Sequence, residues 1–224
     1  MATESKIRDA AESGSESSAQ DFFGIFGLPR RLNIDLKALE REFYRLSRKL
    51  HPDLYARASA EEQAWSLEQS SRLNDAYRTL RDPIARTEYL LKLEGVQLEE
   101  QSRAATDQAR ESGTQKKQVV PADLLEEVFD LNMQLEEMRA AKKMGEQADA
   151  SVQRDLETAR INFTARLEAI SAQLQTLWSE WDAAAARCGS GAERNHVRDK
   201  IVDLLNRRSY IRNLVRDVNE ALEA

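Results

Sequence analysis

The stretch Arg45-Leu46-Ser47-Arg48-Lys49-Leu50-His51-Pro52-Asp53 decides how the first part of this chain folds. Around its start, apolar residues recur at helical steps of three and four: Leu36, Leu39, Phe43, Leu46 and Leu50. Asp35 is a suitable cap for this helix. Pro52 ends it, because the residue before a proline is displaced from the helical region and the ring cannot extend the hydrogen-bond ladder. The pattern predicts a helix with one core face, followed by a loop.

Helical periodicity resumes after this loop, from about Glu61, and breaks at Asp82-Pro83. Its apolar positions are Trp65, Leu73, Ala76, Tyr77 and Leu80. A shorter helix then carries Tyr89, Leu90 and Leu93 to Gly95. Upstream, five large apolar residues between Phe22 and Leu28 need a surface on which to dock. We expect these segments to form one unit over residues 20–96, preceded by a disordered tail at 1–19.

The second half of the chain predicts a three-helix bundle over residues 120–224, after a polar linker at 97–119. Its helices are expected at about Pro121–Met144, at about Asp149–Arg187 and after Gly189-Ser190-Gly191. The first helix has a core stripe of Leu124, Val128, Leu131, Leu135 and Met138. The second has a seam of Phe163, Leu167, Ile170, Leu174, Leu177 and Trp181. The third aligns Val197, Ile201, Leu204, Ile211, Val215, Val218 and Leu222.

Composition agrees with an all-α fold and excludes several classes of function. The 224 residues include four prolines, eight glycines and no alternating strand pattern. No stretch approaches the roughly 20 apolar residues of a membrane-spanning helix and no signal peptide is evident, so we expect a cytoplasmic protein that binds no membrane. A net charge of −6 argues against nucleic acid as a partner. With Cys188 alone and two distant histidines, no disulfide, metal site or cofactor is expected.

The residues His51-Pro52-Asp53 suit a recognition loop. Proline restricts the backbone on both sides, so the imidazole and the carboxylate lose little conformational freedom on binding. The preceding helix is basic, with Lys37, Arg41, Arg45, Arg48 and Lys49. Of these, Arg45, Arg48 and Lys49 lie near the loop and should steer an acidic partner surface. A catalytic interpretation would make His51 a base oriented by Asp53. We expect no catalytic residue and no enzyme, because the sequence contains no Gly-x-Ser-x-Gly motif and Cys188 lies in another segment.

The first bundle helix carries more apolar residues than one core face requires. Leu125, Phe129 and Met133 form a second stripe, rotated from the core stripe by roughly a quarter to half a turn. Acidic residues flank it: Glu126, Glu127, Asp130 and Glu136. This pattern is typical of an exposed hydrophobic interface with an acidic rim. The alternative is that the second stripe packs against the first unit.

The first unit resembles a J-domain, the module with which co-chaperones engage DnaK-type ATPases. The resemblance covers about Asp21 to Gly95 and rests on the basic helix, on His51-Pro52-Asp53 and on a second helix that ends in Leu73-Asn74-Asp75-Ala76-Tyr77-Arg78-Thr79-Leu80. The opening stretch from Asp21 to Pro29 and the closing stretch from Arg81 to Leu91 are similar to the HscB type. In that family a J-domain is joined to a C-terminal three-helix bundle, so the resemblance spans nearly the whole chain.

The HscB resemblance implies a co-chaperone that stimulates the ATPase of a DnaK-type (HscA-like) chaperone and brings to it an iron-sulfur cluster scaffold protein. It implies chaperone binding by His51, Pro52, Asp53, Arg41, Arg45, Arg48 and Lys49. It implies scaffold binding by Leu125, Phe129, Met133, Tyr210, Glu126 and Asp130. We expect a monomer or weak oligomer. The alternative is a J-domain or coiled-coil adaptor with an unrelated client, acting in general protein folding or assembly.

Some conspicuous residues are expected to be structural or incidental. Trp65, Phe163, Trp178 and Trp181 lie on helical stripes and are interpreted as core residues. His196 is expected to face solvent, and Cys188 to be an incidental thiol.

Overall fold

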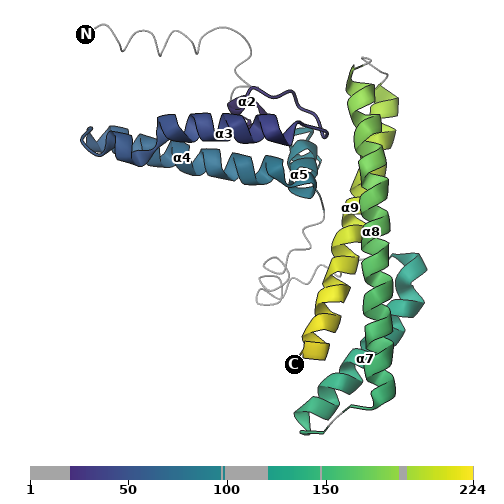
Figure 1. Cartoon of the computed structure of the whole chain (residues 1–224). Coiled ribbons are helices and arrows are strands. Elements are labelled where there is room, and N and C mark those ends of the chain that lie inside the picture. Colours follow the sequence, from purple (N-terminus) through teal and green to yellow (C-terminus); the bar gives the residue numbers. More distant parts are fainter. Residues whose placement is uncertain (1–20, 97, 99–120, 147, 187–190, 224) are drawn as a thin grey trace, which may run out of the picture. The chain divides into compact units, whose positions relative to one another are not determined.

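The computed structural model describes residues 21–96, 98, 121–146, 148–186 and 191–223. Every regular element in this described part is helical (Figure 1), which confirms the all-α prediction. Contacts divide the chain into two compact units, Met1–Val96 and Gln97–Ala224. The predicted tail at 1–19, nearly all of the predicted linker at 97–119, and Cys188 lie outside the described residues.

The first unit is built around a helical hairpin in which α3 and α4 run side by side (Figure 1). Its elements are α2 (Phe22–Ile25), α3 (Leu36–Leu50), the 3-10 turn η1 (Pro52–Tyr55), α4 (Ala60–Arg81) and α5 (Pro83–Leu93). Local side chains fix where these helices begin. The Asp35 carboxylate accepts from the amide of Lys37 at 2.9 Å, and Ser59 and Glu62 form a capping box at the start of α4.

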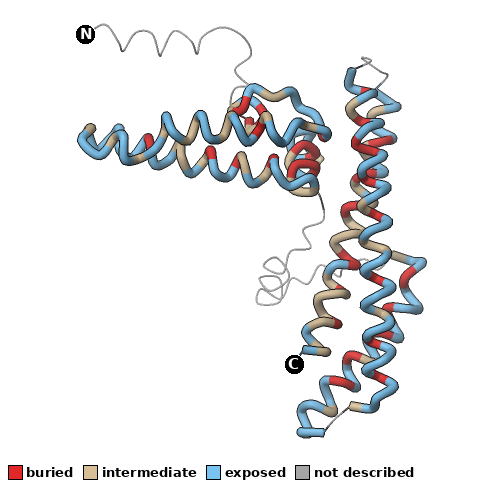
Figure 2. The backbone as a smooth tube through the Cα atoms, viewed as in Figure 1, coloured by how far each residue is buried: buried red, intermediate tan, exposed pale blue. Residues whose placement is uncertain are grey.

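The core of the first unit lies between the hairpin, α2 and α5 (Figure 2). Its most deeply buried apolar side chains are Phe23, Leu32, Leu39, Leu73, Ala76, Leu80, Leu90 and Leu91. The apolar segment around α2 docks as expected: the Phe22 ring stacks on Tyr89 with centroids 4.4 Å apart. The Phe22 amide also donates to the Tyr89 hydroxyl at 2.9 Å.

The end of α3 is held to α4 by two hydrogen bonds. The Leu50 carbonyl accepts from the hydroxyls of Ser66 at 2.8 Å and Ser70 at 2.7 Å. A helix leaves its last carbonyls without intrahelical donors, and here the Leu54 amide, which would be the next donor, bonds to the His51 carbonyl instead. The two serines therefore supply the donors that the turn at Pro52 removes.

The prediction that Trp65 belongs to the core is wrong. Its side chain is 47% exposed, whereas the neighbouring Ser66 is fully buried. Successive helical residues differ by about 100° in direction, so the two cannot share one face. The serine occupies the buried position because its hydroxyl reaches the Leu50 carbonyl. Leu36, expected on the core face of α3, is also exposed, while Leu39 of that face is fully buried.

The second unit contains the predicted three helices, of which α8 and α9 lie side by side and α7 packs against them (Figure 1). Its elements are η2 (Ala122–Leu124), α7 (Leu125–Lys143), α8 (Ala150–Ala186) and α9 (Gly191–Glu223). The predicted core stripe of α7 is buried throughout, and so is the seam of α8 apart from the half-buried Leu167. On α9 the stripe is only partly right. Three residues of the predicted stripe are only half-buried: Leu204, Val215 and Leu222. Three residues outside the predicted stripe are buried: Leu205, Tyr210 and Leu214. The buried face of α9 is wider than one stripe because α9 contacts both other helices.

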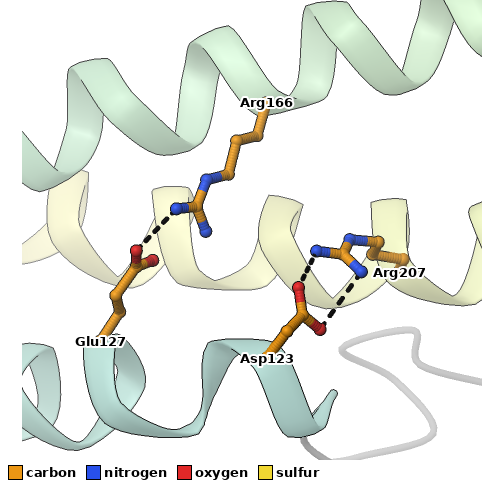
Figure 3. Close-up of polar contacts among 4 residues, drawn as sticks. All are labelled: Asp123, Glu127, Arg166 and Arg207. Carbon is orange, nitrogen blue, oxygen red and sulfur yellow. Dashed lines mark hydrogen bonds and ion pairs between the residues drawn. The ribbon is translucent and has the colours of Figure 1, made fainter.

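Two ion pairs fasten η2 and the start of α7 to the other helices of the bundle (Figure 3). The Arg207 guanidinium of α9 donates to both carboxylate oxygens of Asp123, and Arg166 of α8 donates to Glu127 at 2.6 Å. The hydrogen bond from Arg207 lowers the pKa of Asp123. Glu127, expected in the acidic rim of the second stripe, instead faces α8.

Replacing both Ser66 and Ser70 by alanine should weaken the hairpin by more than the sum of the single replacements. Each single variant keeps one donor for the Leu50 carbonyl, whereas the double variant leaves a part-buried carbonyl unpaired, which typically costs about 1–3 kcal/mol. Hydrogen exchange of the α3 amides measures the loss as faster local opening. Ser71→Ala, at an exposed serine of α4, is the matched control. Strictly additive effects would contradict the shared acceptor.

Removing the Asp123 carboxylate should affect stability in a pH-dependent way. Because the pKa of Asp123 is lowered in the folded chain, its stabilisation is present above the unfolded value of about 3.9 and disappears as pH falls through the folded value. Exposed ion pairs contribute up to about 1 kcal/mol to the free energy of unfolding. Near pH 6, Asp123→Asn should therefore lower the melting temperature by no more than about 2–4 °C, and near pH 2 it should change the melting temperature very little.

Thermal unfolding followed by circular dichroism at both pH values makes this comparison. The control is Glu136→Gln, which removes an ion pair with Arg139 inside α7 and so breaks no link to another helix. A melting difference for Asp123→Asn that is the same at both pH values would show that Arg207 does not account for it.

Candidate functional site

The turn at His51-Pro52-Asp53, called the corner below, faces solvent. The His51 side chain is 54% exposed and that of Asp53 is 89% exposed, while Pro52 is half-buried as the first residue of η1. His51 Nδ1 accepts the Asp53 amide at 3.3 Å and lies 3.5 Å from the Asp53 carboxylate. The corner is therefore a short, internally bonded turn that presents polar groups outward and packs neither of them into the core.

The hydrogen bonding of His51 defines which proton it offers to a partner. Nδ1 can accept from the Asp53 amide only when it carries no proton, so in this arrangement the neutral ring has its proton on Nε2. A protonated imidazole would instead donate from Nδ1 to the Asp53 carboxylate. In the neutral form the corner thus offers one N–H donor and one carboxylate acceptor to a partner surface.

The outer face of α3 is strongly basic and leads to the corner. Arg41, Arg45, Arg48 and Lys49 are all exposed. Arg45 pairs with Glu42 at 2.7 Å, whereas within the described part of the chain no carboxylate pairs with Arg41, Arg48 or Lys49. Arg48 and Lys49 lie in the last turn of α3, next to the corner, where a helix favours positive charge, and Arg41 lies further back on the same helix.

Helix α7 presents a separate, apolar surface. Leu125, Phe129 and Met133 are 54%, 66% and 60% exposed, although each lies within a turn of a buried core residue. The separation of two apolar stripes predicted from helical geometry is therefore correct. Glu126 and Asp130 are exposed on the same helix, beside this row of three, called the α7 row below.

Tyr210 does not share this exposure. It is only 5% exposed on α9, and its burial raises the pKa of its hydroxyl. The ring of Tyr210 is thus packed within the bundle and lies outside the exposed α7 row, and its part in scaffold binding stays a prediction.

Sequence reasoning missed an apolar group beside the corner. Leu54 is 67% exposed, and the Trp65 ring stands edge-on to Tyr55 with centroids 5.9 Å apart. The signal was present in the phase of α4, because the later core residues Leu73, Ala76 and Leu80 place Ser66 on the buried face. The sequence analysis placed Trp65 in the core because large aromatic residues usually lie there.

The remaining conspicuous residues have structural environments. Phe163, Trp178 and Trp181 are buried as expected, and His196 is exposed as expected. The Arg194 guanidinium lies over the Trp181 ring, 4.6 Å from its centroid. In the described ranges, no three or more His, Cys, Asp or Glu side chains are grouped so that they could hold a metal ion. None of the described helices has both the length and the apolar character needed to cross a membrane.

Comparison with known structures supports this fold. The chain is similar to the chaperone HscB from Vibrio cholerae, with a TM-score of 0.57, 24% identity, and coverage of 91% of this chain and 98% of that one. It is also similar to the human co-chaperone protein HscB, with a TM-score of 0.53, 19% identity, and coverage of 93% and 84%. At these identities the likeness concerns the fold.

Sequence comparison is more specific, although no protein-family model matches the chain. The co-chaperone protein HscB homolog of Bordetella petrii is 46% identical over 92 residues, which span 41% of this chain and only about half, 54%, of that protein. The co-chaperone protein HscB homolog of Bordetella avium is 35% identical over 150 residues, which span 67% of this chain and 79% of that protein. With this extent of shared sequence and the shared helical fold, the chain belongs to the HscB family of co-chaperones.

Proposed function

We propose that this chain stimulates the ATPase of a DnaK-type (HscA-like) chaperone and delivers an iron-sulfur cluster scaffold protein to it. The observation that carries the proposal is the exposed corner at the end of the basic helix α3. Membership of a co-chaperone family supports it. The protein acts by binding two partners, through surfaces that belong to different units of the chain.

The corner and α3 engage the chaperone. Arg41, Arg48 and Lys49 are exposed and pair with no carboxylate of the described residues, so they attract an acidic surface and make the association rate depend on salt. The corner then makes the specific contact, since the Asp53 backbone amide donates to His51 Nδ1 and so orients the imidazole ring before binding. Binding that favours the hydrolysis-competent state of the chaperone speeds ATP hydrolysis by shifting a population, so this chain needs no catalytic group.

The α7 row engages the scaffold protein. Three apolar side chains that are more than half exposed on consecutive turns form a continuous contact surface, and Glu126 and Asp130 supply a polar rim. The ion pairs of Asp123 and Glu127 hold the opposite side of α7 against the bundle. The attachment of α7 to the bundle therefore directs the α7 row outward, whereas Tyr210 is buried and lies outside this exposed row.

Carrying both surfaces on one chain couples the two events. A scaffold protein bound to α7 meets the chaperone at the effective concentration set by the chain that joins the units, so modest individual affinities suffice. We propose that the chain acts as a monomer or weak oligomer, because both surfaces need to remain free for partners. A cytoplasmic location and the absence of nucleic acid as a partner stay predictions.

Substitution of the corner histidine tests the first half of the proposal. His51→Gln should reduce stimulation of the chaperone ATPase by at least tenfold, because the glutamine cannot reproduce the ring's hydrogen bond and outward donor together. Steady-state phosphate release measures this with purified components. The control is His196→Gln, at an exposed histidine of α9. Undiminished stimulation by His51→Gln would exclude the corner as the activating contact.

Substitution of the α7 row tests the second half. Leu125→Ala combined with Phe129→Ala should weaken binding of the purified scaffold protein by at least tenfold, because it removes most of the exposed apolar area of α7. Isothermal titration calorimetry gives the affinity. Ile161→Ala removes a side chain of α8 that is 64% exposed and provides the matched control. Equal losses in the control and the double variant would mean that the site lies elsewhere.

A further inference from the structure

We infer that Leu54, Tyr55 and Trp65, called the corner patch, form an apolar anchor that binds the ATPase chaperone beside the corner. The inference rests on the proposed function, which it extends from polar and charged contacts to an apolar one. Its basis is the position of Trp65, whose exposed fraction of 47% is unusual for the largest side chain and contradicts the core position expected from the sequence.

Tyr55 contacts Trp65, and Leu54 is the neighbour of Tyr55 in the turn that contains the corner. Tyr55 and Trp65 meet edge to face, with ring centroids 5.9 Å apart. Leu54 precedes Tyr55 in the same 3-10 turn as Pro52 and Asp53, and its side chain is 67% exposed. The amide of Leu54 donates to the His51 carbonyl at 3.0 Å. A partner that contacts the corner therefore meets Leu54 within one turn of backbone.

The corner patch is rigidly built. The capping box of Ser59 and Glu62 fixes the first turn of α4, and the Gln63 side-chain amide donates to the Ala58 carbonyl at 3.0 Å. These bonds tie the loop that carries Tyr55 to the helix that carries Trp65. Binding therefore orders few further groups, which is the condition under which an aromatic anchor contributes most to affinity.

The charges near the corner patch indicate what kind of partner surface can bind it. Leu54 and Tyr55 directly follow Asp53, and the exposed cations Arg48 and Lys49 precede His51, so a partner that covers the corner and the corner patch also meets positive charge. A second copy of the same basic helix would be repelled. The fitting partner is a surface with an apolar depression flanked by carboxylates, and continuity with the corner assigns that surface to the chaperone that the corner engages.

The test separates affinity from activation. Trp65→Ala should raise the concentration of this chain that half-saturates the chaperone ATPase by about tenfold and leave the maximal stimulated rate nearly unchanged, since the patch anchors and the corner activates. Trp65→Phe should have a smaller effect. The matched control is Leu67→Ala: Leu67 is 64% exposed on the same helix but points about 200° away from Trp65, so its removal should change neither quantity.

Fluorescence gives an independent readout of the same contact. Trp65 is exposed, whereas Trp178 and Trp181 are buried, so the difference in acrylamide quenching between the unsubstituted chain and Trp65→Ala reports on Trp65. Addition of the ATP-bound chaperone should protect this part of the signal from quenching. Continued quenching at saturating chaperone would overturn the inference.

The possible results distinguish this inference from the proposed function. If Trp65→Ala shifts half-saturation no more than Leu67→Ala while His51→Gln abolishes stimulation, the inference is wrong and the proposed function stands. If His51→Gln retains full stimulation, the proposed function is wrong whatever Trp65→Ala does. If Trp65→Ala converts a sedimenting dimer into a monomer, a second copy covers the corner patch and the inference is overturned.

Discussion

The carbonyl of Leu50 receives hydrogen bonds from two serine hydroxyls of the neighbouring helix. A proline two residues after Leu50 ends α3, and the amide that could have served the carbonyl turns to His51 instead. Without other donors, this part-buried carbonyl would favour unravelling of the last turn of α3. Ser66 and Ser70 remove that tendency and fix the distance between α3 and α4. The exposed corner and the basic face that leads to it depend on this junction.

The same junction explains the exposure of Trp65. A helix that uses Ser66 to bond the Leu50 carbonyl directs the preceding residue about 100° away, toward the outside of the hairpin. A large aromatic residue is thereby placed beside the corner rather than in the core. The buried Ser66 inside the hairpin and the exposed Trp65 on its surface both follow from the same rotation of α4 about its axis.

The second unit divides the two sides of α7 by a similar logic. Asp123 and Glu127 pair with arginines of α9 and α8 on one side of the helix, and the core stripe packs beside them. The α7 row is left on the other side, where it faces solvent. Each exposed ion pair is weak by itself, but together with the buried stripe they define the rotation of α7 about its axis. The ion pairs on one side of α7 thus help to keep the α7 row exposed on the other side.

The sequence by itself determined the helices, the ends of α3 and α4, the corner and the two stripes of α7. These features depend on interactions within one or two helical turns: the cap at Asp35, the proline at 52 and the spacing of Leu125, Phe129 and Met133. Only the tertiary structure decided the burial of Tyr210 and the pairing of Asp123 with Arg207. Each of these depends on which neighbouring helix faces the residue, and the spacing of residues along one helix does not specify that neighbour.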